Sequence, residues 1–370
     1  MKLHRFGPAV ALAMAASLTL AACGGDDSSS DAGGAEGGSE SEGGEELSGR
    51  LVGAGASSQE SAMTAWIAGY LEVQPEVEVQ YDAVGSGAGR EQFLAGATDF
   101  AGSDAYMDEE ERGMVADACA GGEAIHFPMY ISPVAVPYNL PGVDDLNLAP
   151  EVLAGIMNGD ITTWDDEAIA ADNPDAELPG TEITVVHRSD DSGTTENFME
   201  YLSAAAPDAW PHEASDAWPV EGGEAAAQTT GVMQVINSTE GTIGYADASA
   251  VTGQSASIGV GEEFVPFSPE AAAKVVEASE PAETGVEGDL ALELARDTTE
   301  SGAYPIVLVS YHIACKEYDD AERANNVKAF LEYVASEEGQ QAASEAAGSA
   351  PIGEGTREQV MSSIEMIQGG

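Results

Sequence analysis

Basic residues are scarce in this sequence of 370 residues. It contains 12 Lys and Arg against 66 Asp and Glu, which gives a formal net charge of -54. Such a chain cannot neutralise the phosphates of a nucleic acid or of an anionic membrane surface. We therefore exclude nucleic acid as a partner. An acidic excess of this size suggests a cell that lives in high salt, where repulsion between surface carboxylates is screened.

Cysteine and histidine are also few, at three and five residues. The histidines do not cluster, and no run of His, Asp and Cys suggests a catalytic metal pair, so we expect neither a metal nor a cofactor. The sequence also lacks the G-x-S-x-G motif of the α/β-hydrolases. These absences argue against an enzyme.

The apolar stretch at the N-terminus is too short to span a bilayer comfortably. It covers residues 7–22, follows Lys2 and Arg5, and ends in the sequence LAAC at Cys23. This ending resembles the lipobox of bacterial lipoproteins, in which the cysteine is lipidated and becomes the mature N-terminus. The alternative is an ordinary secretory signal with a chance cysteine. We expect residues 1–23 to be a lipoprotein signal peptide.

The segment over 24–48 contains Gly, Ser and acidic residues and almost nothing to bury. This composition is typical of a flexible tether. A lipid on Cys23 and a tether would hold the folded part at the outer face of the cytoplasmic membrane. In an exported protein the remaining cysteines, Cys119 and Cys315, favour one disulfide.

From residue 49 onwards, short apolar runs alternate with amphipathic ones, which is typical of an α/β protein. We expect strands over 51–55, 77–81, 99–104, 125–138, 183–186, 241–245 and 304–314. We expect helices over 58–71, 90–95, 148–158, 231–236 and 321–347, and a long helical run after Ser268.

Several of the expected strands end in turns rich in small hydroxyl residues. The turns have the sequences GAGASS at 53–58, GSGAG at 85–89 and HRSDDSGTT at 187–195. In an open parallel sheet, ligands bind outside the carboxyl ends of the strands, where helix N-termini offer free N–H groups. Arg188 adds a planar, permanently charged fork that suits a tetrahedral oxyanion.

Asp104, at the end of the sequence DFAGSD, looks unsuited to an anion site because a carboxylate repels an anion. It suits an anion that carries a proton. Phosphate near neutral pH keeps at least one P–OH group, which can donate to a carboxylate, whereas sulfate is fully ionised. An acceptor in a dry site therefore rejects sulfate through a repulsive, unpaired contact.

Together these motifs resemble the phosphate-binding lipoprotein of the bacterial high-affinity phosphate ABC importer. YDAVGSGAG at 81–89, NLPGV at 139–143 and GDITTWDDEAIAADNP at 159–174 belong to the same resemblance. The motifs occur in the family's order over most of the chain after the tether. The resemblance implies a type II periplasmic-binding-protein fold with two α/β lobes and a ligand cleft between them.

The resemblance also implies roles for single residues. Ser57 and Ser86 match hydroxyl donors, and Ser58 matches a backbone N–H donor, at a position where the family often has an aromatic residue. Asp104 matches the acceptor of the phosphate proton. The cradle at the next helix start is matched by Ser192, Gly193 and Thr194. Arg188 matches the arginine that binds the anion, Asp190 matches the carboxylate that orients it, and His187 receives no direct role.

We expect lobe one to comprise 49–128 and 305–370 and lobe two 129–304, joined by crossover strands near 128–134 and 303–312. The ligand would draw the lobes shut, because only the closed form makes both sets of bonds. The closed protein, a monomer, would deliver inorganic phosphate to a membrane permease.

Three alternatives stay open. A binding protein for sulfate or molybdate would use a similar cage. An exported serine hydrolase or phosphatase would use Ser192 as nucleophile and His187 as base. A sensory or surface-interaction lipoprotein would carry a degenerate site.

Overall fold

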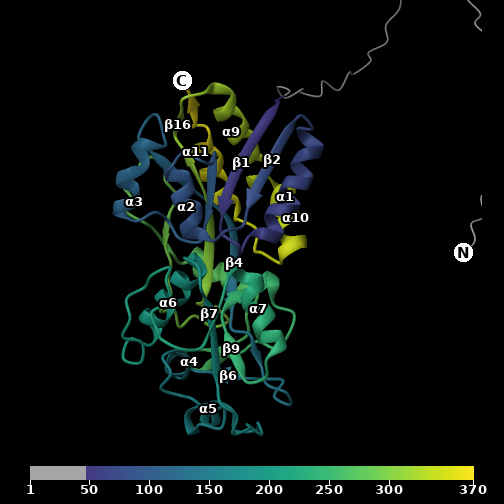
Figure 1. Cartoon of the computed structure of the whole chain (residues 1–370), viewed down its shortest axis with the longest axis vertical. Coiled ribbons are helices and arrows are strands. Elements are labelled where there is room, and N and C mark those ends of the chain that lie inside the picture. The colour runs from purple at the N-terminus through teal and green to yellow at the C-terminus, as the bar shows by residue number, and fades with distance from the viewer. Residues whose placement is uncertain (1–46) are drawn as a thin grey trace, which may run out of the picture. The chain divides into compact units, whose positions relative to one another are not determined.

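The structure is a computed structural model that describes residues 47–370. The predicted signal peptide, Cys23 and almost all of the predicted tether lie outside the described residues. Within the described part, no helix is both long and apolar enough to cross a membrane. The predicted α/β, two-lobed fold is confirmed, and Figure 1 shows the two groups of elements above and below the middle of the molecule.

The first lobe is built on a six-stranded sheet in the order β10-β4-β15-β3-β1-β2. Strand β1 pairs in parallel with both β2 and β3, whereas β15 runs antiparallel to β3 and β4. The parallel strands therefore direct their carboxyl ends toward the same edge. The strands are β1 (Gly49–Gly55), β2 (Val77–Asp82), β3 (Phe100–Ser103), β4 (Ala124–Ala135), β10 (Ala246–Asp247) and β15 (Val307–Cys315).

The second lobe contains a four-stranded sheet in the order β5-β9-β7-β8, in which β7 runs parallel to both neighbours. Its strands are β5 (Tyr138–Asn139), β7 (Thr184–Arg188), β8 (Glu224–Ala226) and β9 (Thr242–Gly244). A three-stranded sheet contains β6 (Asn147–Leu148), β11 (Ser257–Val260) and β12 (Glu263–Val265). Two two-stranded pairs are β13 (Glu280–Pro281) with β14 (Leu292–Glu293), and β16 (Glu317–Tyr318) with β17 (Gln368–Gly369).

Helices cover the sheets of both lobes. Around the first sheet lie α1 (Glu60–Val73), α2 (Ser86–Leu94), α3 (Glu109–Met114), α9 (Ala321–Ala335), α10 (Glu337–Ala347) and α11 (Glu354–Ile364). In the second lobe lie α4 (Pro150–Met157), α5 (Glu167–Asp172), α6 (Gly193–Ala205) and α7 (Gln228–Ser238). Helix α8 (Pro269–Glu277) packs against β4 and β15.

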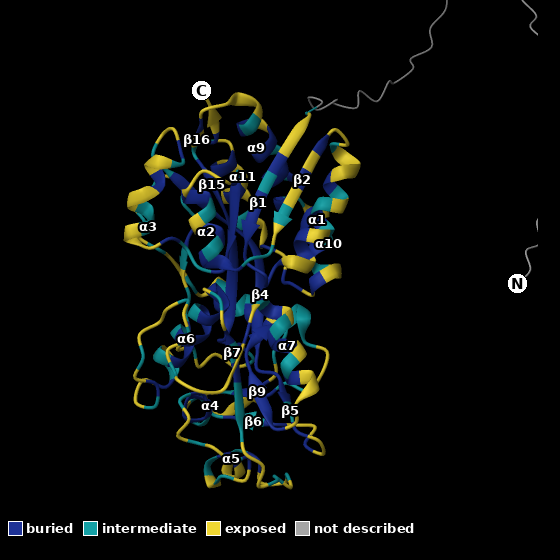
Figure 2. Ribbon diagram, in the orientation of Figure 1, coloured by how far each residue is buried: buried dark blue, intermediate teal, exposed yellow. Residues whose placement is uncertain are grey.

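The two long strands β4 and β15 pass from one lobe to the other, and Figure 2 shows both in the dark blue of buried residues. Every residue of each strand is buried. They pair antiparallel from Val307 opposite Pro133 to Cys315 opposite Ala124. A disulfide joins Cys315, at the end of β15, to Cys119. These strands fall on the predicted crossover segments, while the predicted lobe bounds themselves stay a prediction.

The glycines at 85–89 do not form a turn ahead of a helix over 90–95, so that prediction is wrong. Helix α2 already begins at Ser86, and only Gly85 has a positive φ, of 104°. Gly89 lies inside the helix because α2 approaches β1 closely. A Cβ atom on Gly89 would lie 2.3 Å from the Cα atom of Gly55.

Three further helix predictions need correction. The helical run after Ser268 ends at Glu277, since Pro281 and two left-handed glycines, Gly285 and Gly288, interrupt it. The helix expected over 321–347 is divided at Ser336, whose side chain caps α10. Helix α7 extends beyond 231–236 at both ends, and α11 was not predicted.

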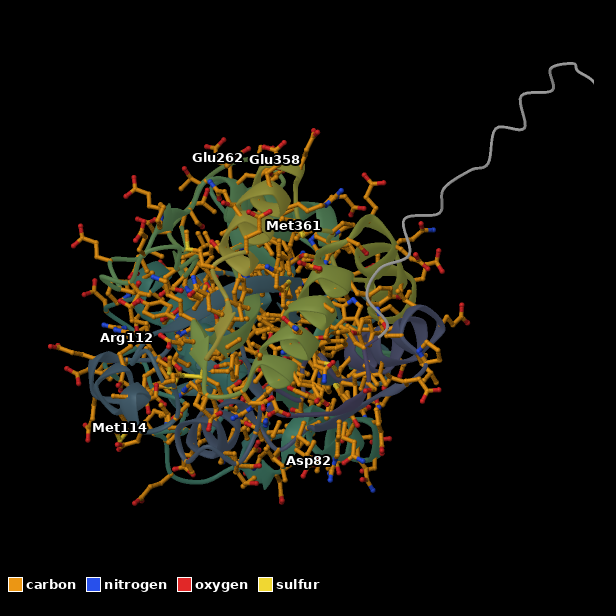
Figure 3. All side chains as sticks on the ribbon, turned by 90° about the horizontal axis from the view of Figure 1, so that it is seen from above. Asp82, Arg112, Met114, Glu262, Glu358 and Met361 are labelled. Carbon is orange, nitrogen blue, oxygen red and sulfur yellow. A yellow bond between two sulfur atoms is a disulfide. The ribbon has the colours of Figure 1, made fainter. Side chains whose placement is uncertain are left out.

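Figure 3 shows acidic side chains such as Glu262 and Glu358 at the periphery, as expected for a solvated acidic surface.

Asp247 has a fully buried carboxyl group and lies in β10, the short strand that pairs with the crossover strand β4. Its Oδ1 accepts from Tyr130 Oη at 3.0 Å and from Ser249 N at 2.9 Å. Within residues 47–370 no group donates to its Oδ2 in good geometry. Burial raises the pKa of Asp247 to about 6, so the native fold favours the neutral acid.

Asp247→Asn should remove this pH dependence, because Asn keeps the Oδ1 acceptor and carries no charge. The stabilisation from the neutral acid is complete below the unfolded pKa near 4 and is lost as the pH rises through about 6. The free energy of unfolding of the variant minus that of the parent should therefore be about 2–3 kcal/mol larger at pH 8 than at pH 4. Urea unfolding of both proteins at the two pH values measures this difference. The same difference at pH 4 and at pH 8 would contradict the prediction.

Candidate functional site

The predicted site residues come together between the two sheets. From the first lobe come residues that follow β1, β2 and β3, and from the second lobe residues at the end of β7 and the start of α6. All eight predicted ligand contacts are buried: Ser57, Ser58, Ser86, Asp104, Arg188, Ser192, Gly193 and Thr194. Residues more than 130 positions apart in the chain are thus all buried in this region.

Asp104 is the point at which the lobes meet. Its Oδ1 accepts from Ser58 Oγ of the first lobe at 2.6 Å, and its Oδ2 accepts from Thr194 Oγ1 of the second lobe at 2.8 Å. Its backbone N–H donates to Ser86 Oγ at 3.1 Å. A carboxylate offers about four acceptor positions. Asp104 can therefore hold these hydroxyl groups and still accept a proton from a ligand.

Arg188 is the last residue of β7 and is held by Asp190. Its Nε donates to Asp190 Oδ1 at 2.8 Å, and its Nη2 donates to Asp190 Oδ2. The backbone N–H of Gln228 donates to the same carboxylate at 2.9 Å. Burial tends to raise the pKa of Asp190, but the bonds and charge of Arg188 hold it below its ordinary value. Asp190 is thus an anion that fixes the guanidinium from one edge.

Free backbone donors belong to residues that lie against Asp104. Among residues 47–370, nothing accepts from the backbone N–H of Ser58, Ser86, Gly193 or Thr194. Gly193 and Thr194 lie in the first turn of α6, whose Ser192 cap accepts from Thr195 N at 3.3 Å. Unpaired N–H groups at a helix start favour an anion. We call these N–H donors, together with the Arg188 guanidinium, the cage.

Gly193 lies at a close approach between the lobes. A Cβ atom at this position would lie 2.8 Å from Ser86 Oγ and 2.9 Å from Asp104 Cβ, both of the first lobe. The backbone N–H of Gly87 in α2 donates across the cleft to Asp191 O at 3.2 Å. The lobes are therefore closed on each other around the site.

A cleft of about 770 Å³ has Asp104 in its lining. Its lining includes Tyr106, Glu196, Glu200 and Arg296. Burial raises the pKa of Glu196 to about 7, against the opposing charge of Arg90. The carboxylates make this the acidic side of the site.

Sequence reasoning missed three residues that contact the predicted site. Asn197 Nδ2 donates to Asp104 O at 2.7 Å, and Thr229 N donates to Ser57 Oγ at 3.2 Å. Gln228 N contacts Asp190, as described above. Gln228 and Thr229 follow β8 and open α7, which is the same strand-to-helix pattern that identified the other turns, so that pattern could have found them.

The contacts of His187 do not support the serine hydrolase alternative, in which this residue would act as the base for Ser192. His187 Nδ1 contacts Arg188 O at 2.9 Å, its Nε2 contacts Gly222 O at 3.2 Å, and its ring stacks on Trp218. Neither nitrogen contacts Ser192, so the proposed nucleophile has no base. Within residues 47–370, no group of three or more His, Cys, Asp and Glu side chains is arranged to hold a metal ion.

Comparison with known proteins places the sequence among binding proteins. The sequence model of the PBP superfamily domain matches residues 40–338. "Phosphate-binding protein PstS2" of Mycobacterium bovis is 37% identical over 343 residues, which cover 90% of this chain and 91% of that protein. "Phosphate-binding protein PstS 3" of Mycobacterium tuberculosis is 36% identical over 342 residues, with the same coverage of 90% and 91%.

A solved structure has the same fold. It is a high-affinity periplasmic phosphate-binding protein, PfluDING, bound with phosphate. The superposition covers 85% of this chain and 93% of that chain, with a TM-score of 0.70 and 23% sequence identity.

Proposed function

The chain belongs to the PBP superfamily and, within it, to the PstS phosphate-binding proteins, and from this membership we propose that it binds inorganic phosphate and delivers it to an ABC-type permease. The family is one of transport binding proteins and not of enzymes. The phosphate would lie between the lobes and leave when they open at the permease.

The observation that carries the proposal is that buried Asp104 bonds to residues of both lobes, Ser86 among them, and that the Arg188 guanidinium lies near Gly85, the residue before Ser86. A proton acceptor and a cationic fork, with free N–H groups from both lobes, match a tetrahedral anion that still carries a proton. Neutral donors are strong where water is excluded, so a protein with a net charge of -54 can bind an anion. Sulfate and molybdate carry no proton near neutral pH, so they have no O–H group that could donate a hydrogen bond to Asp104.

The site roles that we propose follow from the contacts. Ser57 and Ser86 would donate hydroxyl groups, and Ser58, Gly193 and Thr194 would donate backbone N–H groups. Ser192 caps the helix that presents two of these donors. Ser58, at a position where related proteins often have an aromatic residue, also holds Asp104 through its hydroxyl.

Asp104→Asn should cost more selectivity than affinity. The amide cannot repel sulfate as a carboxylate does, and its NH₂ group can donate to an oxyanion. Phosphate affinity should fall by about tenfold, while the preference for phosphate over sulfate should fall by about 100-fold or more. Calorimetric titrations of parent and variant with both ions measure this. If both affinities changed by the same factor, Asp104 would not be the residue that recognises the proton.

PstS-type binding proteins are extracytoplasmic, and we propose that this chain is held at the outer face of the membrane by a lipid on Cys23. The LAAC sequence and the Gly/Ser/acidic segment after it support this. Fractionation of cells that express the full chain tests the anchor. Recovery with the membranes is expected, and recovery in the soluble fraction would contradict it.

A further inference from the structure

The start of helix α7 contacts both the opposite lobe and the carboxylate that orients Arg188. We infer that Gln228 and Thr229 form a latch that holds the lobes closed and couples closure to the alignment of Arg188. This inference rests on the proposed function, because it assigns the latch to retention of phosphate. Neither residue belongs to the cage itself.

Two side chains of the latch bond across the cleft. Gln228 Nε2 donates to Ala83 O, just after β2, at 2.7 Å. Thr229 Oγ1 lies 3.1 Å from Ser57 Oγ, and Thr229 N donates to the same oxygen at 3.2 Å. Residues 145 and 172 positions apart are joined by these bonds. Such contacts form only when the lobes approach.

Thr229 also sets the direction in which Ser57 can donate. A serine oxygen has two lone pairs and one proton. The N–H of Thr229 occupies one lone pair, and when the Thr229 hydroxyl donates to the other, the Ser57 proton is available for an anion. The latch thus prepares one of the proposed phosphate donors from the opposite lobe.

The backbone of Gln228 connects the latch to the guanidinium. Its N–H donates to Asp190 Oδ1, the same oxygen that accepts from Arg188 Nε. Gln228 is the only non-glycine residue among 47–370 with a positive φ, of 61°. A left-handed conformation of this kind persists where the surroundings enforce it and is frequent at functional sites. Here the surroundings are bonds to Ala83 and Asp190.

The test is the rate at which phosphate leaves the protein. Gln228→Met keeps the length of the side chain but cannot donate, and Thr229→Val keeps the shape but lacks the hydroxyl group. Each should speed phosphate release about tenfold, with an unchanged association rate, because the lost bonds form after encounter. Stopped-flow measurement of both rates separates the effects. The preference for phosphate over sulfate should stay as in the parent.

Thr230→Val is the matched control, since Thr230 is exposed on the same helix turn. It should release phosphate at the parent's rate. The melting temperature without phosphate should be the same in all variants, which separates a latch from a merely structural role. If the parent binds phosphate and both latch variants release it as slowly as the parent, the latch is contradicted while the proposed function stands. A parent that binds no phosphate would overturn the proposed function and the latch together.

Discussion

Arg188→Ala should lower phosphate affinity by about 10- to 150-fold. The substitution removes the only cation among the proposed ligand contacts and leaves the half-buried carboxylate of Asp190 without its cationic partner. Losing a charged bond in a dry site costs about 1.5–3 kcal/mol, and breaking a buried ion pair costs about 3–5 kcal/mol. Calorimetric titration with phosphate measures the affinity, and urea unfolding measures the stability.

A second substitution separates the two effects of Arg188. In Arg188→Ala with Asp190→Asn no charge is left unpaired, so the stability should recover while phosphate affinity stays low. Arg188→Lys keeps the charge but lacks the planar fork, and its affinity should lie between those of the parent and the alanine variant. If Arg188→Ala bound phosphate like the parent, Arg188 would not contact the anion.

Gly193→Ala should weaken phosphate binding by about 10- to 100-fold without weakening the fold. The new methyl group would lie under 3 Å from Ser86 Oγ and Asp104 Cβ, and overpacking of this kind costs about 1–3 kcal/mol. Both atoms belong to the other lobe, so the conflict exists only in the closed form. In the helix itself alanine is favoured over glycine by about 0.5–1 kcal/mol.

Stability and affinity should therefore move in opposite directions in this variant. Gly231→Ala in α7 is the matched control, because its Cβ atom would lie 3.7 Å from the nearest atom, an ordinary contact. It should bind phosphate like the parent. Unchanged phosphate affinity in Gly193→Ala would show that binding does not require the closed approach of α6 to the first lobe.

The sequence predicted the contacts within the proposed site wherever the signal was local. HRSDDSGTT carries the arginine, its carboxylate partner and a capped helix start within nine residues, and the structure brings these together as expected. The burial of β4 and β15 was also evident, since the run at 125–138 is apolar with prolines and the run at 304–314 is apolar and β-branched. In both cases the pattern and the physical cause lie in one segment.

Other features could not be read from neighbouring residues. The bond between Gln228 and Ala83 depends on how two distant turns face each other, and Gln and Thr also occur in ordinary helices. The glycine-rich composition of 85–89 suggests a turn. The structure instead shows that a glycine such as Gly89 is needed because α2 packs closely on β1. Such tertiary constraints have no local periodicity to reveal them.

The most direct test of the account is the phosphorus NMR signal of bound phosphate as a function of pH. A phosphate that donates its proton to Asp104 in a closed, dry site should keep one protonation state. Its resonance should stay at one position from about pH 6 to about pH 9, while the resonance of free phosphate moves across that range. A bound resonance that titrated together with free phosphate would contradict the account.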